Sequence, residues 1–351
     1  MNSHRVRERG TRTTARTGIA RGTGRAHSKA ILLGEHTVVH GTPAIAFPVP
    51  ALSVSAIAWR GRPVTIPQPT DSPAGLRFTA GNPLTADTEM SGPRVAVDEA
   101  LRRWGLAEEV VEIVLDCGDI PPARGLGSSA ACAGAAVRAV AELYGRSIDA
   151  ETLYELVQCG EQVAHGRASG VDASAVLACG PIWFQQGAAR PTRVGLDAVL
   201  VLADTGMPGA TQHAVAAVRR TLDRNPVDAG RILDRATELV ESAADDLEAG
   251  RVQPLGATLL DFQDLLTELG VSTPEIDTLV SAAVGAGAHG AKLTGAGLGG
   301  CVLALTDIGG AAAEVSAALR RAGAVQTWIV PVTSGQHPFP SRTRPERGTR
   351  Q

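Results

Sequence analysis

Short runs of apolar and β-branched residues alternate along the chain with longer segments in which apolar residues recur every three to four positions. The short runs predict strands, because an alternating or continuous apolar run of this length is typical of a buried strand. The longer segments predict amphipathic helices. We expect strands at 51–59, 111–117, 197–205, 300–306 and 325–332, and helices at 94–104, 128–144, 150–165, 211–222, 231–248, 255–269, 274–287 and 310–322.

The order of these elements favours an α+β fold over a doubly wound sheet. Several strands follow one another as hairpin neighbours instead of alternating strictly with helices. With 351 residues, of which 44% are hydrophobic, the chain can bury one large core or two joined cores. Residues 185–196 lack periodicity and are rich in Gly, Pro and Arg, so they predict the boundary between two lobes.

One helix has a clear start signal in the sequence. Ser272 and Glu275 have the spacing of a capping box, and Pro274 lies between them in the first turn, where its missing N–H costs nothing. We therefore expect Ser272 to cap this helix.

Both ends of the chain are expected to lie outside the fold. Residues 1–24 are rich in Arg, with Gly, Thr and Ser between, and residues 334–351 contain three prolines and little to bury. Such segments cannot offset the entropy of ordering by burial, so both are predicted to be disordered tails. An organelle transit peptide stays an alternative for the first one.

The overall charge argues against two kinds of partner. The formal net charge is −3, which gives no positive field of the kind that attracts nucleic acid or anionic lipid. No apolar run approaches the roughly 18 residues that cross a bilayer, and the first 25 residues contain no apolar segment typical of secretion. We expect no nucleic-acid or membrane partner.

The cysteines favour a cytoplasmic location. They are odd in number and form no C-x-x-C pair, which argues against a disulfide framework and against a structural zinc site. A reducing compartment fits this pattern. The five residues are Cys117, Cys132, Cys159, Cys179 and Cys301.

Lysine is nearly absent from the chain. Of 33 basic residues, only Lys29 and Lys292 are lysines. A compact ammonium differs from a planar guanidinium in reaching a single oxygen as a point charge, so these two positions are candidates for a special role. Chance retention is the alternative.

The stretch "GLGSS" at 125–129 predicts an anion site. Gly125 and Gly127 allow positive φ and close approach to a ligand, and we expect Ser128 and Ser129 at the N-cap and in the first turn of the following helix. Free N–H groups and the helix dipole converge there and favour phosphate. An ordinary glycine turn with a serine cap is the alternative, and the stretch is not a Walker loop.

A second glycine cluster, "KLTGAGLGG" at 292–300, formally matches the dinucleotide fingerprint through Gly295, Gly297 and Gly300. That fingerprint needs a helix after the glycines, whereas a strand pattern follows here. We interpret the segment as two strands joined by a glycine loop that approaches a substrate or the first anion site. A plain wide hairpin is the alternative.

The third constellation is "EQVAHGRASGVD" at 161–172. Glu161 lies at the border of an apolar helix stripe, so it is expected to be half-buried and to need a partner, for which Mg²⁺ is suitable. Asp172 is placed to act as a general base or to pair with a cation. The alternative is a capped helix end with a salt-bridged Glu161 and a solvated Asp172, and His165 is interpreted as a structural residue.

These three segments and a fourth, "GRAHSKAILLGEHTVVHGTPAIAFPV" at 24–49, occur in the order of the motifs of one superfamily. The chain resembles the galactokinase, homoserine kinase, mevalonate kinase and phosphomevalonate kinase superfamily over residues 24–332. The fourth segment is similar to the mevalonate kinase version, and "AVQTWIVP" at 324–331 resembles actinobacterial members. The resemblance implies a lobe like ribosomal protein S5 domain 2 at 25–190 and a ferredoxin-like lobe at 191–333.

The resemblance also implies a reaction. It is transfer of the ATP γ-phosphate to the 5-hydroxyl of mevalonate, on the route to isoprenoids, with Mg²⁺. Homoserine kinase and phosphomevalonate kinase stay as alternatives, and a nucleotide-binding regulator without catalysis is a further one. The oligomeric state is left open, with a homodimer as one option.

Residue roles follow from the same resemblance. Asp172 matches the base that takes the proton of the acceptor hydroxyl, and Lys29 matches the lysine beside it. Ser129 and Glu161 match the Mg²⁺ ligands. The loop around the ATP phosphates corresponds to Ala123, Arg124, Gly125, Leu126, Gly127, Ser128, Ser129 and Ala130, and the mevalonate pocket to Glu35, His36, Thr211, Gly295, Ala296 and Gly297. Arg124 and Leu298 depart from the usual motifs and leave nucleotide affinity in doubt.

Overall fold

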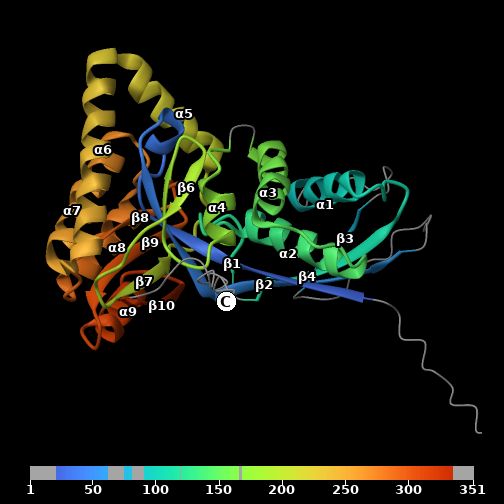
Figure 1. Ribbon diagram of the computed structural model, residues 1–351. Helices are drawn as coiled ribbons and strands as arrows, with labels where there is room; N and C mark the ends of the chain where they lie inside the picture. Colours follow the sequence, from blue (N-terminus) through green and yellow to red (C-terminus); the bar gives the residue numbers. More distant parts are fainter. Residues whose placement is uncertain (1–20, 62–74, 81–90, 119, 166–167, 335–351) are drawn as a thin grey trace, which may run out of the picture.

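The computed structural model describes residues 21–61, 75–80, 91–118, 120–165 and 168–334. The described elements form two halves, each built on an antiparallel sheet with helices packed against it (Figure 1). Buried residues of both halves belong to one continuous apolar cluster. The α+β fold with two lobes is thereby confirmed.

The first half contains six strands and four helices among the described residues. Its sheet has the order β3-β4-β2-β5-β6, with β1 also paired to β2. Helix α2 packs along β1 and β2, and α1 and α3 pack beside it (Figure 1). The elements are β1 (Arg21–Leu33), β2 (Ala44–Arg60), β3 (Gly75–Ala80), β4 (Val111–Asp116), β5 (Ile182–Gln185), β6 (Ala188–Pro191), α1 (Ser91–Arg103), α2 (Ser128–Leu143), α3 (Ala150–His165), α4 (Val171–Leu177) and the 3₁₀ turn η1 (Thr37–His40).

The start of β1 corrects the expected N-terminal tail. Residues 21–24 were expected to be disordered with the rest of 1–24, but they pair with the end of β2. A Cβ at Gly24 would lie 2.0 Å from the carbonyl oxygen of Ala135, so the strand backbone lies directly on α2. Two glycines in a polar context therefore signal close packing here, not disorder, while residues 1–20 lie outside the described part of the chain.

The boundary between the halves also differs from the expectation. Residues 185–191 belong to the hairpin of β5 and β6, in which Gln185 pairs with Ala188 across a turn at Gly187. The connection is therefore restricted to residues 192–197, which join β6 to the second sheet. A four-residue edge strand is too short for a periodic signal, so the segment resembled a linker.

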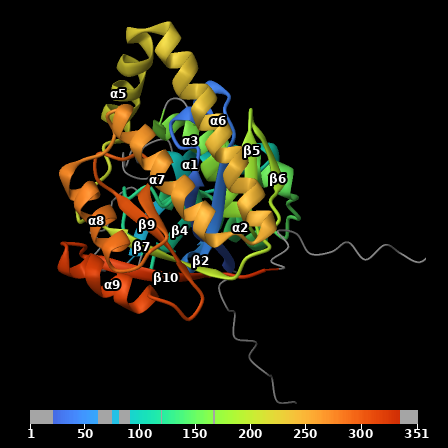
Figure 2. The same ribbon diagram turned by 90° about the vertical axis from the view of Figure 1, so that its left-hand side faces the viewer.

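The second half has the chain order strand, helices, strand, strand, helix, strand. Its sheet has the order β10-β7-β9-β8, which is the ferredoxin-like arrangement. Helices α6 and α7 pack side by side along this half (Figure 2). The elements are β7 (Ala198–Asp204), β8 (Gly290–Thr294), β9 (Cys301–Asp307), β10 (Gln326–Val332), α5 (Thr211–Arg224), α6 (Pro226–Ala249), α7 (Val252–Glu268), α8 (Pro274–Gly285) and α9 (Ala312–Arg321).

The cap of α8 lies one residue later than expected. Thr273, not Ser272, is the N-cap, and its side chain accepts a hydrogen bond from the N–H of Ile276. Ser272 instead donates to the carboxylate of Asp277 at 2.6 Å. Two adjacent hydroxyl residues give the same local signal, and only the contact with Asp277 distinguishes them. Pro274 is at the first helical position, as predicted.

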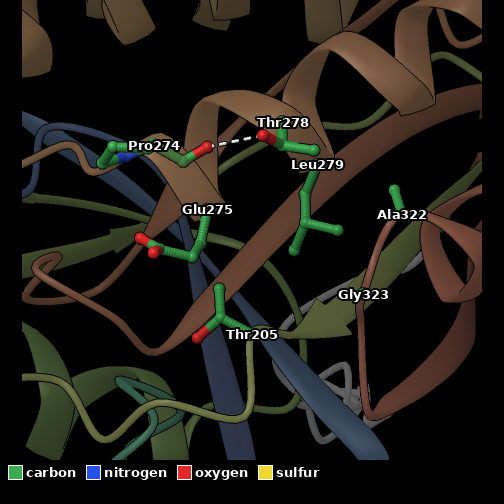
Figure 3. Close-up of a pocket in the computed structure, with 7 residues that line it drawn as sticks. All are labelled: Thr205, Pro274, Glu275, Thr278, Leu279, Ala322 and Gly323. Carbon is green, nitrogen blue, oxygen red and sulfur yellow. Dashed lines mark hydrogen bonds between the residues drawn. The ribbon is translucent and has the colours of Figure 1, made fainter.

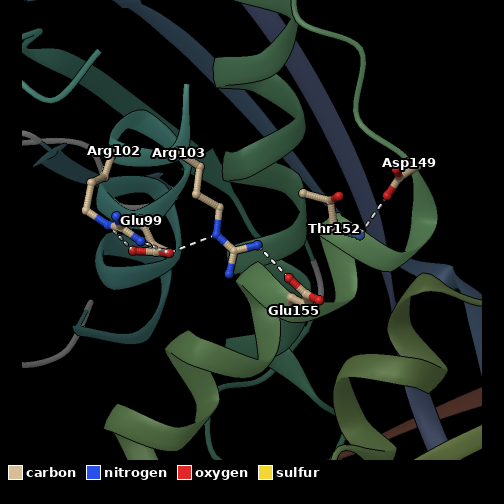
Figure 4. A network of polar contacts seen from close by, with 6 residues as sticks. All are labelled: Glu99, Arg102, Arg103, Asp149, Thr152 and Glu155. Carbon is tan, nitrogen blue, oxygen red and sulfur yellow. Dashed lines mark hydrogen bonds and ion pairs between the residues drawn. The ribbon is translucent and has the colours of Figure 1, made fainter. Parts of the chain in front are cut away.

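Helices α1 and α3 are tied together on their outer side. Glu99 accepts hydrogen bonds from Arg102 and Arg103, and Arg103 also reaches Glu155 of α3 at 2.5 Å (Figure 4). Deeper in the same interface, a Cβ at Gly160 would lie 2.3 Å from the carbonyl oxygen of Gly92. This close approach fixes the position of the α3 segment that carries Glu161.

None of the described helices is both long and apolar enough to cross a bilayer.

Candidate active site

Lys29 and Asp172 form an ion pair at the junction of β1 and α4. The Lys29 Nζ lies 2.9 Å from Oδ1 of Asp172, and the lysine side chain is 1% exposed while the aspartate is 38% exposed. Asp172 is the second residue of α4, which begins after Gly170 in a left-handed conformation. The pair therefore combines a buried cation with a carboxylate that an incoming molecule can reach.

The glycine loop before α2 is fastened to the same lysine. The carbonyl oxygen of Leu126 accepts hydrogen bonds from the N–H of Lys29 at 3.0 Å and from the hydroxyl of Ser28 at 2.8 Å. A Cβ at Gly127 would lie 2.9 Å from Cγ of Lys29, so the lysine stem packs on the bare backbone of the loop. The loop and the ion pair consequently form one unit.

The start of α2 is open to an anion. Gly127 is the N-cap, in a left-handed conformation with φ 73°, and no side chain caps the helix. The first intrahelical hydrogen bond is donated by the N–H of Ala131 to the carbonyl oxygen of Gly127. The N–H groups of residues 128–130 therefore have no intrahelical partner. Such a helix start fits a phosphate group.

This geometry corrects the expected place of Ser128. The residue occupies the first helical position and not the N-cap, because Gly127 adopts the positive φ that this turn requires. Ser129 follows in the first turn, as predicted. The backbone N–H groups at this helix start are therefore not capped by a serine side chain.

The two glycine loops touch each other. A Cβ at Gly295 would lie 2.6 Å from Cα of Gly125, and one at Gly125 would lie 2.9 Å from the carbonyl oxygen of Thr294. The segment 292–300 is a loop between antiparallel strands β8 and β9, as predicted from the strand pattern that follows it. The loop thus brings backbone of the second half directly onto the loop 123–130.

Arg124 holds the loop 123–130 to the second half from the other side. Its Nε donates to Oδ1 of Asp204 at 2.8 Å, and its terminal nitrogen donates to the carbonyl oxygen of Gly206 at 3.1 Å. The carbonyl of Ala123 accepts from the N–H of Gly209 at 2.8 Å. The guanidinium at this unusual position is therefore engaged by protein groups. Thr211 lies two residues after Gly209, exposed at the start of α5.

A buried ion pair lies on the acceptor side of the expected site. The Lys292 ammonium contacts Oε1 of Glu35, donates to the carbonyl oxygen of Leu293 at 2.5 Å and lies 5.6 Å from the centre of the Phe262 ring. Both charged side chains are at most 2% exposed. Burial raises the pKa of Glu35 and lowers the pKa of Lys292, and in each case the partner charge opposes the shift.

One oxygen of this pair is left available. Oε2 of Glu35 is buried and has no hydrogen-bond partner among the described residues. A buried carboxylate oxygen without a donor is costly, so a donor from a bound molecule would be stabilised there.

His36 connects the same segment to the second glycine loop. It has a left-handed backbone with φ 64°, and its Nε2 donates to the carbonyl oxygen of Ala296 at 2.8 Å. Burial lowers the pKa of His36 to about 4, so the ring is neutral near pH 7. Gly297 lies against the backbone of Val271, whose carbonyl also accepts from the N–H of Leu298. These loop residues shape the site through their backbone.

Glu161 is more buried than expected. Its side chain lies on α3 and is 3% exposed. Its charge contributes to a raised pKa of Cys132, which lies one turn after Ser129 on the neighbouring helix α2. The described residues bring no three His, Cys, Asp or Glu side chains together as a metal site. A Mg²⁺ ion bound with phosphate needs only one or two protein carboxylates, and Glu161 would supply one of them, with the Ser129 hydroxyl as a neutral oxygen ligand. His165 is the last residue of α3.

The described residues also enclose two cavities. One of about 480 Å³ lies between η1, α3, the segment just before α4 and the hairpin of β5 and β6. A second cavity of about 200 Å³ lies in the second half between α8 and the end of α9 (Figure 3). No predicted site residue lines either cavity. The residues that line the first one are Val38, Val39, Gly41, Gln162, Ala168, Ser169, Phe184, Gln186 and Gly187.

Several contacts of the site were missed from the sequence. Thr294 both donates to the carbonyl of Ile31 and accepts from its N–H, which clamps β8 to β1. Asp204 and Phe262, the partners of Arg124 and Lys292, were also missed. The only sequence signal was indirect: the scarcity of lysine, which drew attention to Lys292, and the departure of Arg124 from the usual motif.

Comparison with known proteins gives consistent results. The family described as GHMP kinases N terminal domain matches residues 93–180, and the one described as GHMP kinases C terminal matches residues 243–325. A mevalonate kinase from Aeropyrum pernix is 34% identical over 284 residues, covering 80% of this chain and 87% of its own. One from Pyrococcus horikoshii is 32% identical over 320 residues, covering 86% and 92%.

A solved structure agrees with these relatives. The crystal structure of L. major mevalonate kinase in complex with R-mevalonate is similar, with a TM-score of 0.76 and 26% identity, over 90% of this chain and 98% of that one. The motifs at 24–49, 121–131, 161–172 and 292–301 occur in a fold that these proteins share. The chain therefore belongs to the GHMP kinase family, among its mevalonate kinases.

Proposed function

We propose that this protein transfers the γ-phosphoryl group of ATP to the 5-hydroxyl of mevalonate. The observation that carries the proposal is the contact between the ion pair of Lys29 and Asp172 and the open start of α2. Phosphoryl transfer requires mainly that a donor phosphate and an acceptor hydroxyl be aligned and that negative charge be neutralised. A base, a cation and a backbone anion site in direct contact support these requirements.

Asp172 is proposed to accept the proton of the acceptor hydroxyl. Its carboxylate is the exposed member of the pair, and a general base of this kind contributes about 10²- to 10⁴-fold in rate. Lys29 is held by its backbone bond to Leu126 and by its packing on Gly127. Its ammonium fixes the orientation of the carboxylate and adds a positive charge beside the phosphate loop.

The loop 123–130 is proposed to bind the ATP phosphates through the N–H groups of residues 128–130. Ser129 and Glu161 are the residues that would hold Mg²⁺, which supplies positive charge to the phosphate oxygens when bound. The contacts of Gly125 with Gly295 and of Arg124 with Asp204 keep the loop rigid from two sides. Rigid placement of donors is what makes such a site effective.

Mevalonate is proposed to bind where Glu35, His36 and the backbone of 295–297 meet. Thr211 is proposed as a further binding residue, because it lies two residues after Gly209, which packs near the carbonyl of Gly297. The unpartnered Oε2 of Glu35 supports this role, because it would accept a hydrogen bond from a hydroxyl of the substrate. The names of the relatives favour mevalonate over homoserine and phosphomevalonate as the acceptor. We also infer that the enzyme works in the cytoplasm, in keeping with its five free thiols.

The test is a coupled assay of ADP release with ATP, Mg²⁺ and a panel of acceptors. We expect release with mevalonate and at least a hundredfold lower kcat/KM with homoserine or phosphomevalonate. Preference for either of the latter would replace the acceptor while keeping the kinase. Absence of ADP release with every acceptor would support the regulator alternative.

A further inference from the structure

Two cysteines face each other where the first sheet meets α2. Cys117 follows the last residue of β4, and Cys132 lies in the second turn of α2, with their Sγ atoms 3.6 Å apart. Both are free thiols. Cys117 is half-buried, whereas Cys132 is 5% exposed. The pair is therefore in non-bonded contact, with one member open to a small reagent.

The two cysteines lie on either side of the phosphate loop in the sequence. The segment 118–131, which the two cysteines enclose, contains the whole phosphate loop 123–130. A covalent bond between the two sulfurs would close that loop at its base. Cys132 cannot move easily, because the residues on either side of it, Ala131 and Ala133, are fully packed in the core.

We propose that Cys117 and Cys132 are a site of reversible oxidation, at which a peroxide converts the two thiols into a disulfide that encloses the phosphate loop. In the first step the sulfur of Cys117 attacks one peroxide oxygen, the O–O bond breaks, and a sulfenic acid and water form. In the second step the sulfur of Cys132 attacks that of Cys117, the S–O bond breaks, and a second water leaves. Two thiols and hydrogen peroxide thus give one disulfide and two waters, with both electrons supplied by the thiols.

Exposure and hydrogen bonding both make Cys117 the residue that reacts first. It is the more accessible thiol, and its hydrogen bond with Cys132 lowers the pKa of Cys117, which favours the reactive thiolate. Cys132 is then in place as the resolving thiol. A disulfide has an S–S length of about 2.05 Å, so the two sulfurs must approach by about 1.5 Å.

That approach has a consequence for the loop. Because Cys132 is fixed in α2, the displacement falls on Cys117 and on the segment that leads from it to Gly125. We therefore expect the disulfide to weaken binding of the ATP phosphates. This expected effect on ATP binding rests on the proposed function, whereas formation of the disulfide does not.

Peptide mapping of the full-length protein tests the site itself. Cleavage after arginine places Cys117 in the peptide 104–124 and Cys132 in 125–138, so only a disulfide joins the two. After treatment with hydrogen peroxide and alkylation of remaining thiols, we expect the joined peptide, and its loss after dithiothreitol. The variants Cys117→Ser and Cys132→Ala should not yield it, and their thermal midpoints check that they fold.

The exposed Cys179 serves as the internal control for the oxidant. Oxidation of Cys179 while 104–124 and 125–138 stay separate and alkylated would overturn the proposal. So would a disulfide that joins Cys117 to another cysteine.

Steady-state kinetics test the consequence. We expect at least a fivefold rise in the KM for ATP on oxidation, restored by dithiothreitol and absent from Cys117→Ser. An unchanged KM in protein that carries the disulfide would overturn the link to the loop. The activity of the reduced enzyme reports separately on the proposed function.

Discussion

The Lys292 ammonium and the Glu35 carboxylate form a buried ion pair that joins β8 of one half to the end of β1 in the other. Two neighbouring contacts run parallel to it, from Thr294 to Ile31 and from His36 to Ala296. The proposed acceptor side of the site is therefore built jointly by both halves. Its geometry depends on a charge pair that is 257 residues apart in sequence.

Removal of the Lys292 charge should lower the free energy of unfolding. Lys292→Met keeps most of the side-chain volume but leaves the Glu35 carboxylate buried without its counter-charge, which costs about 3–5 kcal/mol of unfolding free energy. The double variant Lys292→Met with Glu35→Gln should recover a large part of this loss, because no charge is then buried alone. Urea unfolding of the wild type, both single variants and the double variant measures the coupling. Strictly additive effects would contradict it.

The same variant should have a distinctive pH dependence. Burial raises the folded-state pKa of Glu35 above its ordinary value, and without Lys292 nothing strong opposes that rise. A raised folded pKa contributes stability at low pH that is lost as the pH rises through the folded pKa. The thermal midpoint of Lys292→Met, relative to that of the wild type, should therefore fall as the pH is raised from 5 to 8. The double variant should show no such fall.

The contribution of His36 to the pH dependence of stability should have the opposite sign to that of Glu35. Burial lowers its folded-state pKa to about 4 from an ordinary value of 6.5, so the unfolded chain binds the proton more tightly. Stability is lost as the pH falls from 6.5 towards 4, by up to about 3 kcal/mol. His36→Gln should flatten this part of the pH profile in urea unfolding. His213→Gln, at an exposed position of α5, is the matched control and should leave the profile unchanged.

A comparison of alanine variants at Gly127 and Gly145 distinguishes the effect of backbone strain from the effect of crowding against Lys29. Gly127 and Gly145 both have positive φ, 73° and 60°, but a Cβ at Gly127 would lie 2.9 Å from Lys29, whereas one at Gly145 meets nothing within 4 Å. Gly145→Ala should cost about 1–2 kcal/mol from strain alone and keep full activity. Gly127→Ala should cost more and lower kcat at least tenfold, because it displaces Lys29, the proposed partner of the catalytic base. Equal kinetics for both variants would refute this role of Gly127.

The proposed role of Glu161 as a Mg²⁺ ligand can be tested against a control residue on the same helix. Glu161→Gln should raise the Mg²⁺ concentration needed for half-maximal activity at least fivefold, because a neutral amide binds Mg²⁺ more weakly than a carboxylate does. Glu155→Gln, on the same helix with a side chain 50% exposed, is the control and should leave the Mg²⁺ titration unchanged. Identical titrations for the two variants would remove Glu161 from the metal site.

The sequence predicts the local features of this protein well. The helices expected from apolar spacing are present, and the strand after the 295–300 glycines distinguished a hairpin loop from a dinucleotide site. The glycines followed by serines located the uncapped start of α2. Each of these features depends on residues close together in the chain, where spacing and backbone freedom carry the information.

The errors have a common physical origin in long-range contacts. Gly22 and Gly24 are ordered by α2, more than 100 residues later, and the partners of Arg124 and Lys292 lie in other elements. Side chains such as Asp204 and Phe262 have no local pattern that identifies them as partners. The one-residue errors at Ser128 and Ser272 arose because the choice between adjacent caps depends on φ or on a tertiary contact.

The central claim is that Asp172 is the base of an ATP-dependent kinase whose acceptor is mevalonate. Asp172→Asn keeps the size of the side chain and removes its ability to take the proton. With ATP and mevalonate saturating, the variant should bind ATP as the wild type does and release ADP at least about 10²-fold more slowly. A folded Asp172→Asn variant that releases ADP at nearly the wild-type rate would contradict the account.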